Sequence, residues 1–246
     1  MSQHIRTSIE HGVLTIRIDR PDKKNALDRA MYAALADALR AGEGDASVGA
    51  IVFLGVPGAF SSGNDIADFA AFAKGDASMA ELEAFLHALA EAGKPLLAGV
   101  DGLAIGIGTT LLLHCDLAFA TPRSVFRTPF VDLGLVPEAA SSLLAPRLMG
   151  HKRTFQLLVM GEPLDAVTAR EFGIVSHVVE DAEAGATEAA RRLAAKPREA
   201  VRLSRQLLRA EPAEVVSRIE LEARHFLERL HSGEAQAAFA AFMRKG

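Results

Sequence analysis

Two glycine-bearing segments of this sequence could supply hydrogen-bond donors for chemistry. The first is Phe60-Ser61-Ser62-Gly63-Asn64-Asp65-Ile66, and the second is Gly102-Leu103-Ala104-Ile105-Gly106-Ile107-Gly108-Thr109. Glycine has no side chain and permits positive φ, so backbone N–H groups in such segments can converge on one oxygen atom. Two N–H groups aimed at a carbonyl oxygen would stabilise negative charge that develops there. The spacing alone, however, favours ordinary tight turns between packed elements.

Other reactive patterns are missing from the sequence. Gly106-Ile107-Gly108 begins a dinucleotide-binding G-x-G-x-x-G, but Leu111 stands where the third glycine is required. The sequence contains no G-x-S-x-G nucleophile elbow, and its eight histidines show neither H-x-x-x-H nor H-E-x-x-H spacing. Cys115 is the only cysteine, which excludes an intramolecular disulfide and a cysteine-rich metal site. We therefore expect no metal and no separately bound cofactor.

Length and charge limit the class of protein further. The 246 residues are 50% apolar, which suits one large domain, and the net charge of −4 disfavours nucleic acid as a partner. The first twelve residues lack the apolar core of a secretory signal. The apolar stretch 94–120 is interrupted by Asp101, His114 and Asp116, so it does not read as a membrane span. These features predict a soluble, cytoplasmic protein.

Periodicity predicts alternating strands and helices, and hence an α/β core. We expect strands at 14–18, 50–54, 95–100 and 117–120, a helix from Asp28 to a stop at Gly42, and a second helix at 79–92. After about Asp181 the composition shifts to Ala, Leu, Glu and Arg, which predicts three helices. The expected division is a core domain at 1–195 and a helical region at 196–246. That region carries apolar residues that a short tail cannot fully bury, which predicts a homo-oligomer (Leu207, Leu208, Ile219, Leu221, Phe226 and Leu227).

Several motifs together resemble the crotonase family, which includes the enoyl-CoA hydratases. They are 20–27 (Arg20-Pro21 to Asn25-Ala26-Leu27), 60–65, 101–106 and 114–120, in the family's order and spacing. The resemblance implies a spiral of stacked ββα units, with C-terminal helices that assemble a homotrimer or a dimer of trimers. It also implies an acyl-CoA thioester substrate, of which coenzyme A is a part, and an oxyanion hole formed by the N–H groups of Asn64 and Ile107.

The acid/base residues distinguish the reactions of this family. Its hydratases use two glutamates, but the matching positions here hold Thr110 and Phe130. The segment 126–142 instead resembles the Δ3,Δ2-enoyl-CoA isomerases of the peroxisomal type, whose single catalytic glutamate corresponds to Glu138 of the Pro137-Glu138 pair. A Pro-Glu pair at a helix start is also a common first-turn pattern that interacts with the helix dipole, so a purely structural role for Glu138 remains the alternative.

The resemblance therefore implies isomerisation of 3-enoyl-CoA to 2-enoyl-CoA in fatty-acid or related acyl-CoA metabolism, with Glu138 as the proton shuttle. The implied substrate-binding residues are Ser62, Gly63, Asn64, Asp65, Ile66, Lys23, Gly106 and Phe130. One alternative is an enoyl-CoA hydratase or another enolate-forming reaction of the family. An alternative of another class is a catalytically silent acyl-CoA-binding protein.

Overall fold

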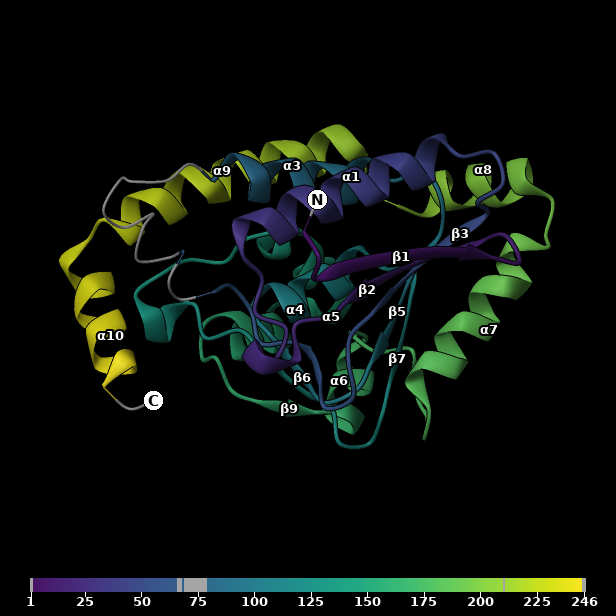
Figure 1. Cartoon of the computed structure of the whole chain (residues 1–246). Helices are drawn as coiled ribbons and strands as arrows, with labels where there is room; N and C mark the ends of the chain where they lie inside the picture. Colours follow the sequence, from purple (N-terminus) through teal and green to yellow (C-terminus); the bar gives the residue numbers. More distant parts are fainter. Residues whose placement is uncertain (1, 66–67, 69–78, 210, 245–246) are drawn as a thin grey trace.

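The computed structural model describes residues 2–65, 68, 79–209 and 211–244, which form helices around two β-sheets (Figure 1). The strands are β1 Ile5–Glu10, β2 Val13–Ile18, β3 Ala50–Leu54, β4 Ala59–Ser61, β5 Leu96–Val100, β6 Leu103–Ile105, β7 Leu117–Ala120, β8 Val125–Arg127, β9 Leu164–Asp165 and β10 His177–Val178. The α-helices are α1 Arg29–Gly44, α3 Ala80–Glu91, α4 Ile107–Thr110, α5 Ser141–Leu158, α6 Ala166–Phe172, α7 Ala182–Ala194, α8 Arg198–Leu208, α9 Pro212–Leu230 and α10 Gly233–Met243. Three short 3-10 helices are η1 Pro21–Lys23, η2 Leu111–His114 and η3 Val131–Leu133.

From β3 to β8, successive strands alternate between two sheets. The larger sheet has the order β1-β2-β3-β5-β7-β10, and the smaller sheet has the order β4-β6-β8-β9. Pairing is parallel from β2 to β10 and from β4 to β8, with antiparallel pairs at β1–β2 and β8–β9. Thus β3, β5 and β7 each pass directly to a strand of the smaller sheet, and each repeat advances the chain by one turn. The predicted spiral of ββα units is confirmed.

Close stacking of these turns requires glycine at one connection. Gly102 joins β5 to β6 with a φ of 83°, and a methyl group added there would lie 2.0 Å from the carbonyl oxygen of Gly58, in the preceding turn of the spiral. Any other residue at position 102 would push these two turns apart.

Helices cover both faces of the larger sheet, so its central strands are buried on both sides. Helices α1, α3 and α9 lie together over one face, and α7 packs on the other (Figure 1). In β3, Ile51 and Phe53 join the α1/α3 core, whereas Val52 packs with Ala186 and Ala190 of α7. Burial on both sides explains why β3 reads as a continuous apolar run.

The beginning of α1 is as predicted, but its end is not. The side chain of Asp28 accepts a hydrogen bond from the N–H of Met31 at 2.8 Å, so Asp28 is the N-cap. The predicted stop at Gly42 is wrong, because α1 continues to Gly44. A methyl group at Gly42 would lie 2.5 Å from Cδ2 of Leu14, so this glycine permits close packing of the helix on β2.

The C-terminal part, as far as it is described, contains four helices, α7 to α10, rather than three. The breaks at Pro197, Pro212 and Gly233 fall at the starts of α8, α9 and α10, as the sequence indicated. Ile219 and Phe226 are buried within the chain itself, which corrects the expectation that a second subunit is needed to cover them. Leu207, Leu208 and Leu221 are exposed, and Leu227 is partly buried. None of the helices in the described ranges has the length and apolar character needed to cross a membrane.

Candidate active site

The loop after β4 directs the backbone N–H of Asn64 away from its nearest neighbour. Gly63 has a φ of 95°, and Asn64 forms a parallel bridge with Leu27. In this bridge the N–H of Leu27 donates to the carbonyl of Gly63, and the N–H of Asp65 donates to the carbonyl of Leu27, both at 2.8 Å. The N–H of Asn64 therefore points to the opposite side. It has no hydrogen-bond acceptor in the described part of the chain.

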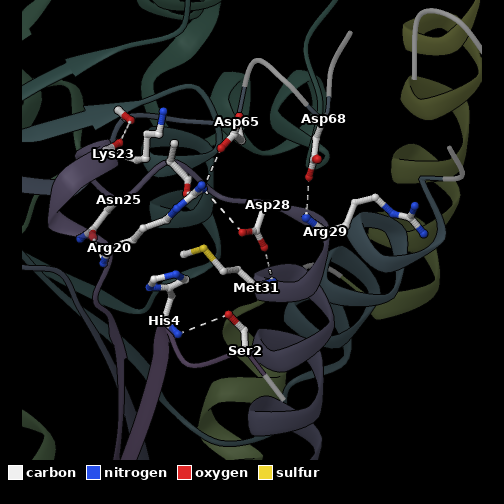
Figure 2. Close-up of polar contacts among 12 residues, drawn as sticks. Ser2, His4, Arg20, Lys23, Asn25, Asp28, Arg29, Met31, Asp65 and Asp68 are labelled. Carbon is white, nitrogen blue, oxygen red and sulfur yellow. Dashed lines mark hydrogen bonds and ion pairs between the residues drawn. The ribbon is translucent and has the colours of Figure 1, made fainter. Parts of the chain in front are cut away.

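Polar contacts from the turn at 20–25 hold this loop in place (Figure 2). The guanidinium of Arg20 donates to Asp65 at 2.7 Å. The side chain of Asn25 is fully buried and donates to the carbonyls of Ile18 and Ala59 at 3.0 and 2.8 Å. Sequence reasoning gave Asn25 no role beyond its place in a motif, although a buried asparagine must satisfy its amide. Its three donor contacts and its positive φ of 58° show that it fixes the turn to β4.

The second glycine-bearing loop lies against the first. Strands β4 and β6 are parallel neighbours, so their carboxyl ends meet at one edge. A methyl group at Gly106 would lie 4.0 Å from Cα of Gly63, and one at Gly63 would lie 3.2 Å from the carbonyl oxygen of Ile105. Gly106 has a φ of 56°, and the next residue, Ile107, begins α4. As the first residue of a helix, Ile107 has an N–H with no acceptor inside the helix, and none occurs among the other described residues.

Glu138 brings a carboxyl group to the same helix. Its side chain is buried, with 6% of the residue exposed, and Oε1 accepts a hydrogen bond from the hydroxyl of Thr110 at 2.5 Å. Oε2 has no partner in the described part of the chain. Thr110 follows Ile107 by three residues and therefore lies on the same face of the turn. The carboxyl of Glu138 thus lies against the helix that begins with the N–H of Ile107.

Burial changes the acidity of Glu138. Removal from water raises the pKa of its carboxyl to about 8, the hydrogen bond from Thr110 opposes this rise, and the nearby charge of Glu222 adds to it. A carboxyl with a pKa near neutrality is suited to accept and return a proton.

Glu138 lies outside the helix to which the sequence assigned it. Helix α5 begins at Ser141, and Ala139 and Ala140 between them have φ values of 59° and 54°. A carboxyl in this position is not part of the first helical turn. The prediction that Glu138 lies in the first turn of this helix is therefore wrong.

Tyr32 was not identified from the sequence, yet it contacts the first loop. Its hydroxyl, from α1, donates to Oδ1 of Asn64, and its ring packs against Phe85 with 5.8 Å between centroids. Burial, followed by the charges of Glu138 and Asp68, raises the pKa of Tyr32 well above its ordinary value, so the hydroxyl stays protonated. The signal available was that Tyr32 is the only tyrosine of the chain and lies on a helix that precedes the loop.

Of the predicted substrate-binding residues, those at 62–65, Gly106 and Lys23 lie together. Ser62 donates from its N–H to the carbonyl of Lys24 at 3.0 Å and from its hydroxyl to the carbonyl of Lys23 at 3.2 Å, so Lys23 lies next to the Asn64 loop. Phe130 is buried in the main hydrophobic core. Ile66 lies outside the described residues.

A model of the enoyl-CoA hydratase/isomerase family matches residues 8–246. The chain belongs to this family. The resemblance to crotonases is thereby confirmed for almost the full sequence, and the family assignment makes the protein an enzyme of the hydratase/isomerase type.

Relatives of known name carry out different reactions. A 4-chlorobenzoyl coenzyme A dehalogenase from Arthrobacter is 37% identical over 203 residues, which are 77% of this chain and 72% of the relative. Enoyl-CoA delta isomerase 2 from Rattus norvegicus is 34% identical over 229 residues, which are 90% of this chain and 58% of the isomerase. The structure of Pseudomonas aeruginosa OdaA aligns with a TM-score of 0.93 at 41% identity and covers 98% of this chain and 99% of that one. Family membership alone therefore does not select the reaction.

Proposed function

We propose that this enzyme converts 3-enoyl-CoA thioesters to 2-enoyl-CoA thioesters. The observation that carries the proposal is the buried carboxyl of Glu138, with its pKa of about 8. Thr110 holds this carboxyl against the helix that begins with the N–H of Ile107, for which the described residues offer no acceptor. A base and a pair of N–H donors on adjacent loops are the minimum that enolate chemistry on a thioester requires.

In the proposed reaction the thioester carbonyl accepts hydrogen bonds from the N–H groups of Asn64 and Ile107. The ionised carboxyl of Glu138 removes a proton from C2, and the electron pair of that C–H bond moves toward the thioester oxygen. The two N–H groups stabilise the resulting dienolate, since they are already oriented and need no rearrangement. Glu138, now protonated, returns the same proton to C4. The double bond moves from C3–C4 to C2–C3, and no water or other reactant is consumed.

The surroundings of Glu138 suit a reaction without water. Leu135, three residues earlier, is 5% exposed, and Phe130 is 6% exposed. The same burial that raises the pKa of the glutamate would keep solvent from the dienolate. Leu82 and Phe72 are further candidates for an apolar wall around the glutamate; Leu82 is buried in the hydrophobic core, and Phe72 lies outside the described residues.

Hydration is less well supported, because the two positions that hold glutamates in the family's hydratases hold Thr110 and Phe130 here. The hydroxyl of Thr110 donates to Glu138, so it does not act as a base toward water. Dehalogenation is the alternative suggested by the Arthrobacter relatives, which are named as 4-chlorobenzoyl coenzyme A dehalogenases. In that reaction a carboxylate such as Glu138 would bond to the chlorine-bearing ring carbon, chloride would leave, and water would hydrolyse the resulting aryl ester, so chloride release is measured together with isomerisation.

The test is a comparison of three substrates with purified enzyme. Conversion of 3-enoyl-CoA is followed by the absorbance of the conjugated product, hydration of 2-enoyl-CoA by loss of that absorbance, and turnover of 4-chlorobenzoyl-CoA by chloride release. We expect kcat/KM for isomerisation to exceed kcat/KM for hydration by at least about 100-fold. A positioned general acid or base contributes at least about that factor to a rate, and the two glutamates of the hydratases are missing here. Faster hydration or chloride release would assign another reaction, and binding without turnover of any substrate would indicate a silent acyl-CoA-binding protein.

A further inference from the structure

The chain between Glu138 and α5 has an unfavourable backbone conformation. Ala139 and Ala140 both have positive φ, of 59° and 54°, and both are buried. This left-handed backbone conformation is unfavourable for residues that have a Cβ. Two such residues in succession keep it only where neighbouring groups hold them. This turn directly follows Glu138, so its geometry determines where the carboxyl lies.

His114, at the end of η2, holds the first alanine of the turn. Its Nε2 lies 2.8 Å from the carbonyl oxygen of Ala139. A carbonyl only accepts, so Nε2 carries the hydrogen, and the buried Nδ1 is without a partner in the described part of the chain. Burial lowers the pKa of His114 to about 4, so the ring is neutral and acts here as a donor.

Glu222, on α9, holds Ser142, the second residue after the turn. Its Oε1 accepts from the N–H of Ser142 at 2.9 Å and from the hydroxyl of Ser142 at 2.5 Å. Ser142 is the second residue of α5, where an N–H has no acceptor within the helix. The N-cap position is Ala140, which has no side-chain acceptor. A carboxyl from a distant helix therefore replaces the missing cap.

The position of Glu222 is not explained by an ordinary ion pair. The residue is 6% exposed, its Oε2 is buried without a partner among the described residues, and Arg218 of the same helix donates to the hydroxyl of Ser142 at 3.1 Å. Burial raises the pKa of Glu222, which opposes its ionisation. A buried carboxyl that keeps one oxygen unsatisfied costs folding free energy. This cost points to a role for Glu222 other than stabilising the fold.

We propose that His114 and Glu222 are positioning residues, which hold the left-handed turn at Ala139 and Ala140 so that the carboxyl of Glu138 remains buried against Thr110. The inference rests on the proposed role of Glu138 as the base. Glu222 has a second effect, because its charge raises the pKa of Glu138. Other polar and charged groups near these residues are the hydroxyls of Tyr32 and Ser141, the guanidinium of Arg218 beside Glu222, and the guanidinium groups of Arg205 and Arg209, which act on His114.

Titration of the Glu138 carboxyl by carbon NMR, with labelled glutamate, tests the inference without any need for turnover. The Glu138 resonance is assigned by its loss in Glu138→Gln. In Glu222→Gln the amide oxygen can still accept from Ser142, so Glu138 should titrate at a lower pH than in the parent, through loss of the charge alone. In Glu222→Ala and His114→Leu the turn should relax and admit water, so the titration should move further toward the ordinary value of 4.5.

Activity toward 3-enoyl-CoA provides a second readout. His114→Leu should lower kcat at least tenfold with KM within threefold of the parent, and His114→Gln, which keeps a donor near the position of Nε2, should recover most of the loss. The control is Glu220→Gln, which removes an exposed carboxyl from α9, the helix that carries Glu222. It should change neither the titration of Glu138 nor the activity.

The inference is overturned if Glu138 titrates in Glu222→Gln and Glu222→Ala as it does in the parent. It is also overturned if His114→Leu keeps the parent titration, or if His114→Gln is as impaired as His114→Leu. Failure of the parent to isomerise 3-enoyl-CoA would contradict the proposed function only, since the titration still reports whether the two residues position Glu138.

Discussion

Burial of Glu138 has opposite consequences for catalysis and for folding. Its pKa rises from 4.5 to about 8 because the charged form loses contact with water, and only Oε1 has a hydrogen-bond partner among the described residues. In an unfolded chain the carboxyl would ionise near 4.5. Between these two pH values the folded state binds more protons than the unfolded state, so the free energy of unfolding falls as the pH rises.

Glu138→Gln should therefore stabilise the fold, and the gain should grow with pH. Relative to the parent, the variant is expected to gain on the order of a few kcal/mol between about pH 5 and pH 8, since a tenfold change in proton affinity corresponds to about 1.4 kcal/mol. Urea denaturation at several pH values measures this difference. An unchanged difference across the range would mean that Glu138 is not buried with a raised pKa.

The ionisation of Glu138 should also determine how the rate of isomerisation depends on pH. Proton abstraction needs the ionised carboxyl, so kcat/KM for 3-enoyl-CoA should increase with pH and level off above about 8, the pKa of Glu138 in the free enzyme. A rate that is constant from pH 6 to 9 would show that another group, or none, titrates during the reaction.

In the proposed reaction the two glycine-bearing loops act through their backbone N–H groups, and the secondary structure explains the positions of these groups. Strands β4 and β6 end side by side, and Ile107 occupies the first position of α4. Helix α4 has only four residues, so its dipole is small. The N–H of Ile107 is therefore the group proposed to stabilise the thioester oxygen. Proline is tolerated at the first position of a helix because the N–H there has no acceptor inside the helix.

Ile107→Pro should accordingly fold and yet lose activity. We expect kcat to fall about 10²–10³-fold, as for loss of one oxyanion-hole donor. Ile107→Val keeps the N–H and should remain within a few-fold of the parent. Circular dichroism establishes that both variants are folded. Equal losses in the two variants would assign the effect to packing of the buried side chain instead.

Most of the elements, though not all of their ends, and the positions of the two glycine-bearing loops were predictable because local sequence determines them. Strand β3 is a continuous apolar run, Asp28 precedes α1 as a capping residue, and the prolines and glycine of the C-terminal region mark helix starts. The surroundings of Glu138 were not predictable. Alanine gives no indication of the left-handed conformation found at Ala139 and Ala140, and Glu222 contacts Ser142 across 80 residues of sequence.

The surface of the protein contains an unusual helix. Helix α8 directs Arg205 inward, where its guanidinium pairs with Asp116 at 2.7 Å, and leaves Leu207 and Leu208 86% and 87% exposed. A helix normally buries its apolar side chains and exposes its charged ones. Adjacent exposed leucines of this kind are typical of surfaces that contact another protein.

The exposed leucines favour an interface on α8, and the resemblance to crotonases implies that the assembly is a homotrimer or a dimer of trimers. Light scattering at micromolar concentration should give three or six times the monomer mass of 26.1 kDa. Replacement of Leu207 and Leu208 by glutamate should lower the mass if α8 lies in the interface, whereas Glu220→Gln should not change it. A parent protein that has the monomer mass would contradict the predicted assembly.

The central claim is that Glu138 transfers the proton. Its nearest acidic competitor in sequence, Asp132, is exposed and paired with Arg127 at 2.8 Å, so it does not offer a buried base. The decisive measurement is single-turnover isomerisation of 3-enoyl-CoA by Glu138→Gln, together with its affinity for the acyl-CoA product. Glutamine keeps the size of the side chain but cannot accept a proton from C2. The rate should fall about 10²–10⁴-fold while the affinity stays within about tenfold of the parent. A variant that isomerises 3-enoyl-CoA at close to the parent rate would contradict the claim.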